Sequence, residues 1–140
     1  MFGKEGIIQM VEVISVESKK QTEFIDITFK IQEIIQEKEI AAGICYLFVP
    51  HTTAGITINE NADPNVVRDI LKEINKVIPM NDHYTHMEGN SAAHIKASIL
   101  GFSEIILIKE RGLMLGTWQG IYFCEFDGPR KRKVFIQIKE

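Results

Sequence analysis

The sequence has 140 residues, of which 45% are hydrophobic and 25% charged, and its formal net charge at pH 7 is −3. These are ordinary globular values, so they exclude a disordered tail, a fibrous repeat and a broad cationic surface for nucleic acid or anionic lipid. A chain of this length can bury a sizeable core without staples, so residues 1–140 are expected to form a single domain.

The N-terminal residues MFGKEGIIQM do not predict a signal peptide, and no apolar run approaches the roughly 20 residues that span a membrane. The default expectation is therefore a cytoplasmic protein without a membrane partner. Cys45 and Cys124 lie in separate apolar runs without the spacing of metal ligands. We expect both to be buried free thiols.

The chain begins with a strand and a helix. Residues 7–18 end in alternating valines and polar residues, which predicts a strand. Residues 24–43 carry isoleucines at helical spacing, which predicts a helix. Asp26 or Thr28 could be its N-cap, and Gly43 lies just beyond its expected end.

Two strands and a second helix follow. Residues 43–50 and 55–60 are rich in β-branched or aromatic side chains, which predicts strands connected by the polar segment between them. Residues 63–79 predict a helix with Asp63 as N-cap and Pro64 in the first helical position. Both local signals agree with the apolar stripe that follows them.

The rest of the chain predicts one more helix and three strands. The elements are a loop at 79–90, a helix at 91–101, and strands at 104–110, 117–127 and 132–139, with turns at 112–116 and 127–130. Helices in the middle and strands at both ends predict an α+β fold with mostly antiparallel pairing. The short connections favour hairpins, because parallel neighbours need long crossovers.

The histidines are the first candidates for function. His51, His86 and His94 each fall in a loop or at the start of an element. Three imidazoles with an open fourth position form a catalytic zinc set, so we expect a zinc ion at these residues. The alternative is that each histidine caps or packs locally, since no tight motif links them. His83 competes with His86 for the loop position, and the spacing to Asn90 favours His86.

Other polar residues accompany these histidines. Asn90 and His94 are four residues apart at a helix start, so they share one face, although Asn90 could also be a plain N-cap. Asp63 is explained by its cap position. Glu60 has no such role and is the better candidate for a general base.

A third cluster is GTWQGIYFCEFDGPRKRK. Trp118 and Gln119 offer an aromatic surface and an amide, Glu125 offers a carboxylate, and the guanidinium fork of Arg130 suits phosphate. Alternatively, Arg130 is a solvated hairpin residue paired with Glu125 or Asp127. The run PRKRK is more typical of a solvated hairpin arm than of a nucleic-acid patch.

Taken in order, FVPHTTAGITINENADP, GNSAAHIKASILG and LGTWQGIYFCEFDGPRKRKVFIQ resemble the YjbQ family, whose members have been described as secondary thiamine-phosphate synthase enzymes. The resemblance spans nearly the whole chain and implies an antiparallel β-sandwich flanked by helices. It also implies a homotrimer with a polar pocket near the subunit boundary. The implied pocket residues are His51, Thr52, Thr53, Asn59, Glu60, Asp63, His86, Asn90, His94, Trp118, Gln119, Glu125 and Arg130. Members commonly carry an aspartate where this chain has Ala92, so no mechanism here can use a carboxylate at that position.

The implied activity joins hydroxymethylpyrimidine diphosphate to a thiazole phosphate and releases pyrophosphate. The resemblance implies catalytic roles for His51, Glu60, His94 and Arg130, with charge on the diphosphate stabilised by Arg130 or by a metal, either zinc or magnesium bound with the diphosphate. Trp118 would contact a planar ring. Two alternatives are a non-catalytic trimer that binds a small anion or metabolite, and a metal-dependent hydrolase that uses the same groups to activate water.

Overall fold

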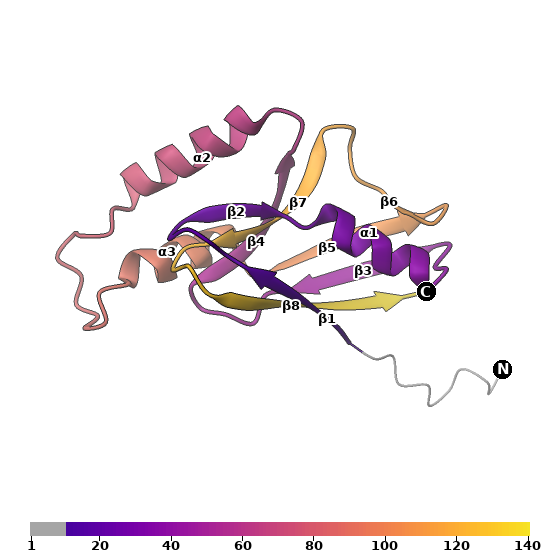
Figure 1. The fold of residues 1–140 in the computed structure, drawn as a ribbon, viewed down its shortest axis with the longest axis horizontal. Helices are drawn as coiled ribbons and strands as arrows, with labels where there is room; N and C mark the ends of the chain where they lie inside the picture. The colour runs from indigo at the N-terminus through magenta and orange to yellow at the C-terminus, as the bar shows by residue number, and fades with distance from the viewer. Residues whose placement is uncertain (1–10) are drawn as a thin grey trace.

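The computed structural model describes residues 11–140, which form two antiparallel sheets and three helices (Figure 1). Sheet A has the order β1 (Glu12–Glu17), β8 (Lys131–Lys139), β3 (Gly43–Phe48), β5 (Ser103–Lys109) and β6 (Gly112–Leu113). Sheet B has the order β2 (Glu23–Asp26), β7 (Gln119–Glu125) and β4 (Ala54–Glu60). The helices are α1 (Thr28–Glu37), α2 (Pro64–Val77) and α3 (Ser91–Leu100). This confirms the predicted α+β class with antiparallel pairing.

The main core lies between the two sheets. Ile56 and Phe123 of sheet B pack in one cluster with Leu47 of sheet A, and α1 adds Ile31 and Ile35 to it. A second cluster joins α3 to the opposite face of sheet B through residues such as Ala93, Ala97 and Phe126. Sheet B is therefore covered on both faces. No helix of residues 11–140 is long and apolar enough to cross a membrane.

Sheet A, in contrast, exposes apolar side chains on the face that points away from sheet B. The exposed residues are Tyr46 and Phe48 on β3, Ile105 and Leu107 on the neighbouring β5, and Val13 on β1, which β8 separates from β3. The ring of Phe48 also stacks on that of Phe135, with centroids 6.5 Å apart. We call these six residues the outer face of sheet A. Large contiguous apolar patches are unusual on monomeric surfaces and are typical of interaction sites.

The local signals succeed for α2 and fail in part for α1. In α2 the carboxylate of Asp63 accepts a hydrogen bond from the backbone N–H of Asn65, as an N-cap should. In α1 the N-cap is Ile27, without a side-chain cap bond, and the helix ends at Glu37 instead of near Gly43. The residues before it form β2, because their backbone pairs with β7. Distant sheet pairing thus overrides the local helix pattern.

The structure also tests the predictions for the turn at 112–116 and for the two cysteines. The turn predicted at 112–116 contains the two-residue strand β6, which pairs with the end of β5. Cys45 and Cys124 are buried free thiols, as expected, and burial raises the pKa of the Cys45 thiol to about 11. Neither cysteine is therefore a reactive thiolate at neutral pH.

Lys96 is a buried cation that the sequence did not reveal. It lies on α3 with 1% of its surface exposed, and its ammonium donates a hydrogen bond of 2.6 Å to the side-chain oxygen of Asn75 on α2. Asn75 in turn donates to the hydroxyl of Thr22. Burial lowers the pKa of Lys96, because the charged form loses its hydration.

Replacing Lys96 with methionine removes a buried charge but also leaves the side-chain oxygen of Asn75 without its donor, so the free energy of unfolding at pH 7 should stay within about 1 kcal/mol of the wild-type value. The folded-state pKa lies below the unfolded one, so wild-type stability should rise relative to the variant as the pH rises toward about 10.4. Urea unfolding at pH 7 and pH 9.5 measures both effects. Lys72→Met, on the exposed side of α2, is the control and should show no such change with pH.

Candidate functional site

The predicted site residues fall at the two ends of the β4–β7 pair. In this antiparallel register Ala54 lies opposite Glu125, and Glu60 lies opposite Gln119. At about 3.4 Å per residue, the two ends are roughly 20 Å apart. We call one group the histidine end; it contains His51, Thr52, Thr53, His86, Asn90, His94, Glu125 and Arg130. We call the other the tryptophan end; it contains Asn59, Glu60, Asp63, Trp118 and Gln119.

A buried ion pair holds the histidine end together. The carboxylate of Glu125, which has no exposed surface, accepts hydrogen bonds from the guanidinium of Arg132 and from the hydroxyl of Ser18. Arg132 also donates to the hydroxyl of Thr53 at 2.8 Å. Burial alone would raise the pKa of Glu125, but hydrogen bonds from Arg132, Ser18 and the N–H of Asp127 outweigh it and hold that pKa below its usual value. Glu125 thus orders the loop that carries Thr53 and presents no open carboxylate.

Arg132 was missed as a functional residue, although the sequence carries a signal for it. In residues 131–139 Arg132 has the same phase as Val134 and Ile136, which point into the core. A charged residue in the inward phase of a strand needs a buried partner. Arg132 lies within the basic run PRKRK, which is typical of a solvated hairpin arm, so the composition of the run does not indicate that this one residue is buried.

His51 extends from the end of β3 toward β8. Its ring Nε2 accepts a hydrogen bond of 2.9 Å from the backbone N–H of Lys133. Partial burial and then the charge of Arg132 lower its pKa, while Glu125 opposes them. His51 is therefore neutral at pH 7, and because Nε2 is the acceptor, its proton lies on Nδ1. Neither ring nitrogen then offers a free lone pair.

The histidines do not form one metal set within a single subunit. His86 and His94 lie together, with ring centroids 5.4 Å apart in an edge-to-face arrangement. Between residues 11 and 140, however, no group of three or more histidine, cysteine or carboxylate side chains is placed to hold a metal. His51 is already engaged with β8. The zinc site expected from three imidazoles is not assembled by one chain.

Asn90 and Arg130 meet at Asp127. The side-chain amide of Asn90 donates 3.0 Å to the carboxylate of Asp127, and the guanidinium of Arg130 donates to the same oxygen at 3.1 Å. Arg130 also donates to the carbonyl of Asp127, so the hairpin pairing considered for it is present, with its side chain half exposed. Asn90 occupies the N-cap position of α3 but makes no side-chain cap bond. Its carboxamide oxygen is buried without any hydrogen-bond partner among residues 11–140.

The tryptophan end is more open. Trp118 is 63% exposed, and no hydrogen bond within residues 11–140 uses the carboxylate of Glu60. The backbone around Glu60 is fixed, because its carbonyl accepts from the hydroxyl of Tyr122. The side-chain oxygen of Gln119 accepts from the N–H of Gly116. Asp63 is occupied as the cap of α2, which leaves Glu60 and Trp118 as the groups that can meet a ligand.

Comparison with known proteins agrees over almost the whole chain. Residues 12–140 match the family model described as UPF0047 protein YjbQ-like. A UPF0047 protein of Methanocaldococcus jannaschii is 50% identical over 132 residues, which cover 94% of this chain and 96% of that protein. YugU of Bacillus subtilis is 48% identical, over 92% of this chain and 98% of YugU. A crystal structure of a relative from Clostridium acetobutylicum superposes with a TM-score of 0.89 at 54% identity, covering 91% and 99% of the two chains.

Proposed function

Because the chain belongs to the YjbQ-like UPF0047 family, we propose that it is a transferase for phosphorylated small molecules, joining hydroxymethylpyrimidine diphosphate to a thiazole phosphate. The C–O bond between the methylene carbon and the diphosphate breaks, and pyrophosphate leaves with the electron pair. The ring nitrogen of the thiazole supplies the pair for the new C–N bond. The protein's task is to hold both partners and to stabilise the charge that develops on the diphosphate.

The observation that carries this proposal is the unpartnered oxygen of Asn90. A buried polar atom without a partner costs about 1–3 kcal/mol, so it calls for a donor from outside the chain. Its orientation is fixed, because the amide nitrogen donates to the carboxylate of Asp127. The oxygen can therefore accept a hydrogen bond from a ligand N–H or O–H group or from a bound water. His94 follows Asn90 by one helical turn of α3, and the half-exposed Arg130 donates to the same carboxylate oxygen of Asp127 as the amide of Asn90.

The two ends belong to one reaction if two subunits share each site. Within one chain, the histidine end and the tryptophan end of the β4–β7 pair are roughly 20 Å apart. A cyclic trimer repeats one head-to-tail contact, which can set the histidine end of one copy against the tryptophan end of the next. We place this contact on the outer face of sheet A, whose apolar side chains lack any cover in residues 11–140. The carboxylate of Glu60 would then stabilise the positive charge that develops on the thiazole ring, and Trp118 would be a ring platform for the neighbouring copy.

No step of this reaction is assigned to zinc, because the three histidines do not fit that ion within one subunit. Magnesium, which prefers oxygen ligands and enters with phosphates, is the cation that suits a diphosphate substrate. Its contribution would be to neutralise the leaving group. The residues of the chain still have to orient the two substrates and exclude water.

The direct test is to incubate the purified protein with both substrates and magnesium, and to measure thiamine phosphate and pyrophosphate together. The proposal expects both products in equal amounts. Release of phosphate without a condensed product would instead support a hydrolase. Tight binding of either substrate without turnover would support the non-catalytic ligand-binding trimer.

A shared site also predicts complementation between inactive variants. His94→Ala removes the histidine end and Glu60→Gln removes the tryptophan end, so each variant alone should be inactive. Unfolding and refolding a 1:1 mixture should restore about a quarter of wild-type activity, because that fraction of head-to-tail contacts joins two intact ends. Equal treatment of each variant alone is the control. No recovery from mixed trimers would place both ends of the site in one chain.

A further inference from the structure

A hollow of about 550 Å³ lies where β1, β8 and α1 meet, and basic side chains line it. Lys30 of α1 and Lys131 and Lys133 of β8 all face it, and Glu17 is the one acidic residue in its lining. The three lysines are exposed, and none forms an ion pair with a carboxylate of residues 11–140. The net charge of the chain is −3, so these unpaired cations form a local positive patch and are not part of a broad cationic surface.

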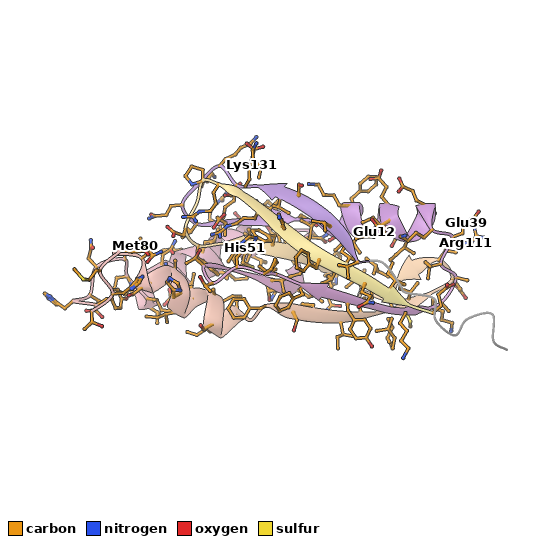
Figure 2. The ribbon with its side chains drawn as sticks, turned by 90° about the horizontal axis from the view of Figure 1, so that it is seen from below. Glu12, Glu39, His51, Met80, Arg111 and Lys131 are labelled. Atoms are coloured by element: carbon orange, nitrogen blue, oxygen red, sulfur yellow. The ribbon has the colours of Figure 1, made fainter. Side chains whose placement is uncertain are left out.

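The backbone beneath these lysines is fixed. Lys131 and Lys133 are two residues apart on one strand, so their side chains leave the same face of sheet A. The ammonium of Lys30 crosses the free edge of β1 and donates to the carbonyl of Ser15 at 3.2 Å. The N–H of Lys133 donates to the ring of His51, which ties the hollow to the histidine end. In Figure 2 Lys131 and His51 both lie between Met80 and Glu12, away from Glu39 and Arg111.

We infer that this hollow binds the diphosphate group of a small phosphorylated ligand. The inference rests on the proposed function, because it gives the leaving diphosphate of that reaction a place. Three ammonium groups match the charge of a diphosphate better than that of a single phosphate. Arg130, the residue that its sequence context favoured for this role, spends two of its donor groups on Asp127.

The surroundings of the hollow select a small anion over a polymer. Glu17 stands beside Lys131 across the β1–β8 pair, and α1 carries Glu33 and Glu37 on the turns after Lys30. A nucleic acid leaving the hollow along either element would bring its phosphates against these carboxylates. A diphosphate that fits within the three lysines meets only Glu17 of these carboxylates and does not extend to Glu33 or Glu37.

Isothermal titration of the full chain with inorganic pyrophosphate, tripolyphosphate and orthophosphate tests this inference. We expect pyrophosphate and tripolyphosphate to bind more tightly than orthophosphate, with affinity that falls as salt is added. Each of Lys30→Met, Lys131→Met and Lys133→Met should weaken pyrophosphate binding about tenfold, the scale of one charge-assisted hydrogen bond. The matched control removes the same charge elsewhere, through Lys72→Met, Lys76→Met and Lys109→Met combined, and should bind as the wild type does. Urea midpoints confirm that every variant is folded.

The inference is overturned if the wild type does not bind pyrophosphate, or if the combined variant at Lys30, Lys131 and Lys133 binds it unchanged. It is also overturned if the control variant loses as much affinity, or if an oligonucleotide binds more tightly than tripolyphosphate. If Arg130→Lys were the only variant to lose pyrophosphate binding, Arg130 and not the three lysines would be the residue that binds the diphosphate. Lysine-dependent pyrophosphate binding in a protein that forms no thiamine phosphate would uphold this site and refute the proposed reaction.

Discussion

Arg132→Met is expected to lower the free energy of unfolding by about 3–5 kcal/mol, the cost of leaving a buried charge without its partner. Glu125 would stay buried with only Ser18 and one backbone N–H as donors. Thr53 would also lose the guanidinium that fixes its hydroxyl. Urea or thermal unfolding of the variant at pH 7 measures the loss.

The pH dependence of this loss identifies its origin. In the wild type the pKa of Glu125 is lowered, so its stabilising contribution is present above about pH 4.3 and is lost as the pH falls through the folded-state pKa. In Arg132→Met burial dominates and Glu125 binds a proton at a higher pH. The gap between the free energies of unfolding of the two proteins should therefore narrow as the pH falls, first where Glu125 of the variant binds its proton and further below about pH 4.3, where the wild type loses its own contribution. The double variant Arg132→Met with Glu125→Leu should recover much of the lost stability, and a double variant no more stable than Arg132→Met would argue against a charge effect.

If the protein forms the proposed trimer, placing charge on the outer face of sheet A is expected to convert it to a monomer. The variant combines Phe48→Glu with Ile105→Glu, two exposed apolar positions on β3 and β5. In a trimer these carboxylates would be desolvated within an apolar contact, which costs far more than their exposure on a free subunit. Light scattering at micromolar concentration measures the mass, and circular dichroism checks that the subunit is folded.

Val77→Glu is the control for this change, since Val77 is 68% exposed on α2 and lies outside that face. It should remain trimeric. A wild type that is a folded monomer at the same concentration would refute the trimer. A charged variant that stays trimeric would show that the subunits meet through another surface. If the sites are shared, the monomeric variant should also be inactive.

Local signals in the sequence predicted what depends on neighbouring residues. Asp63 and Pro64 predict the start of α2 correctly, because an N-cap and a first-turn proline stabilise a helix start through contacts with residues only a few positions away. β2 could not be found in the same way, since its partner β7 follows almost a hundred residues later. For the same reason the helix predicted for residues 24–43 begins too early.

The candidate site shows the same limit. In the sequence the segments HTT and NE are separated by only a few residues, which suggested a single cluster. Those few residues form β4, and an extended strand carries its two ends far apart. The partner of Arg132 could not be named from sequence, because Glu125 and Arg132 meet across the turn between β7 and β8 only after both side chains turn inward. The pairing of Arg130 with Asp127 can be predicted from the sequence, because the two residues are only three positions apart.

The position of β8 in sheet A has a consequence for biosynthesis. β8 lies between β1 and β3, yet it is the last strand to be synthesised (Figure 1). While the ribosome still holds it, β1 has no neighbour in its sheet and the exposed strand edges could pair with other nascent chains. Arg132 and Lys133 belong to this last strand. The hydrogen bonds that they donate to Glu125 and His51 can therefore form only when translation is nearly complete. The fold and its candidate site should therefore form in one step after synthesis, and the unfinished chain is the form that most needs a chaperone.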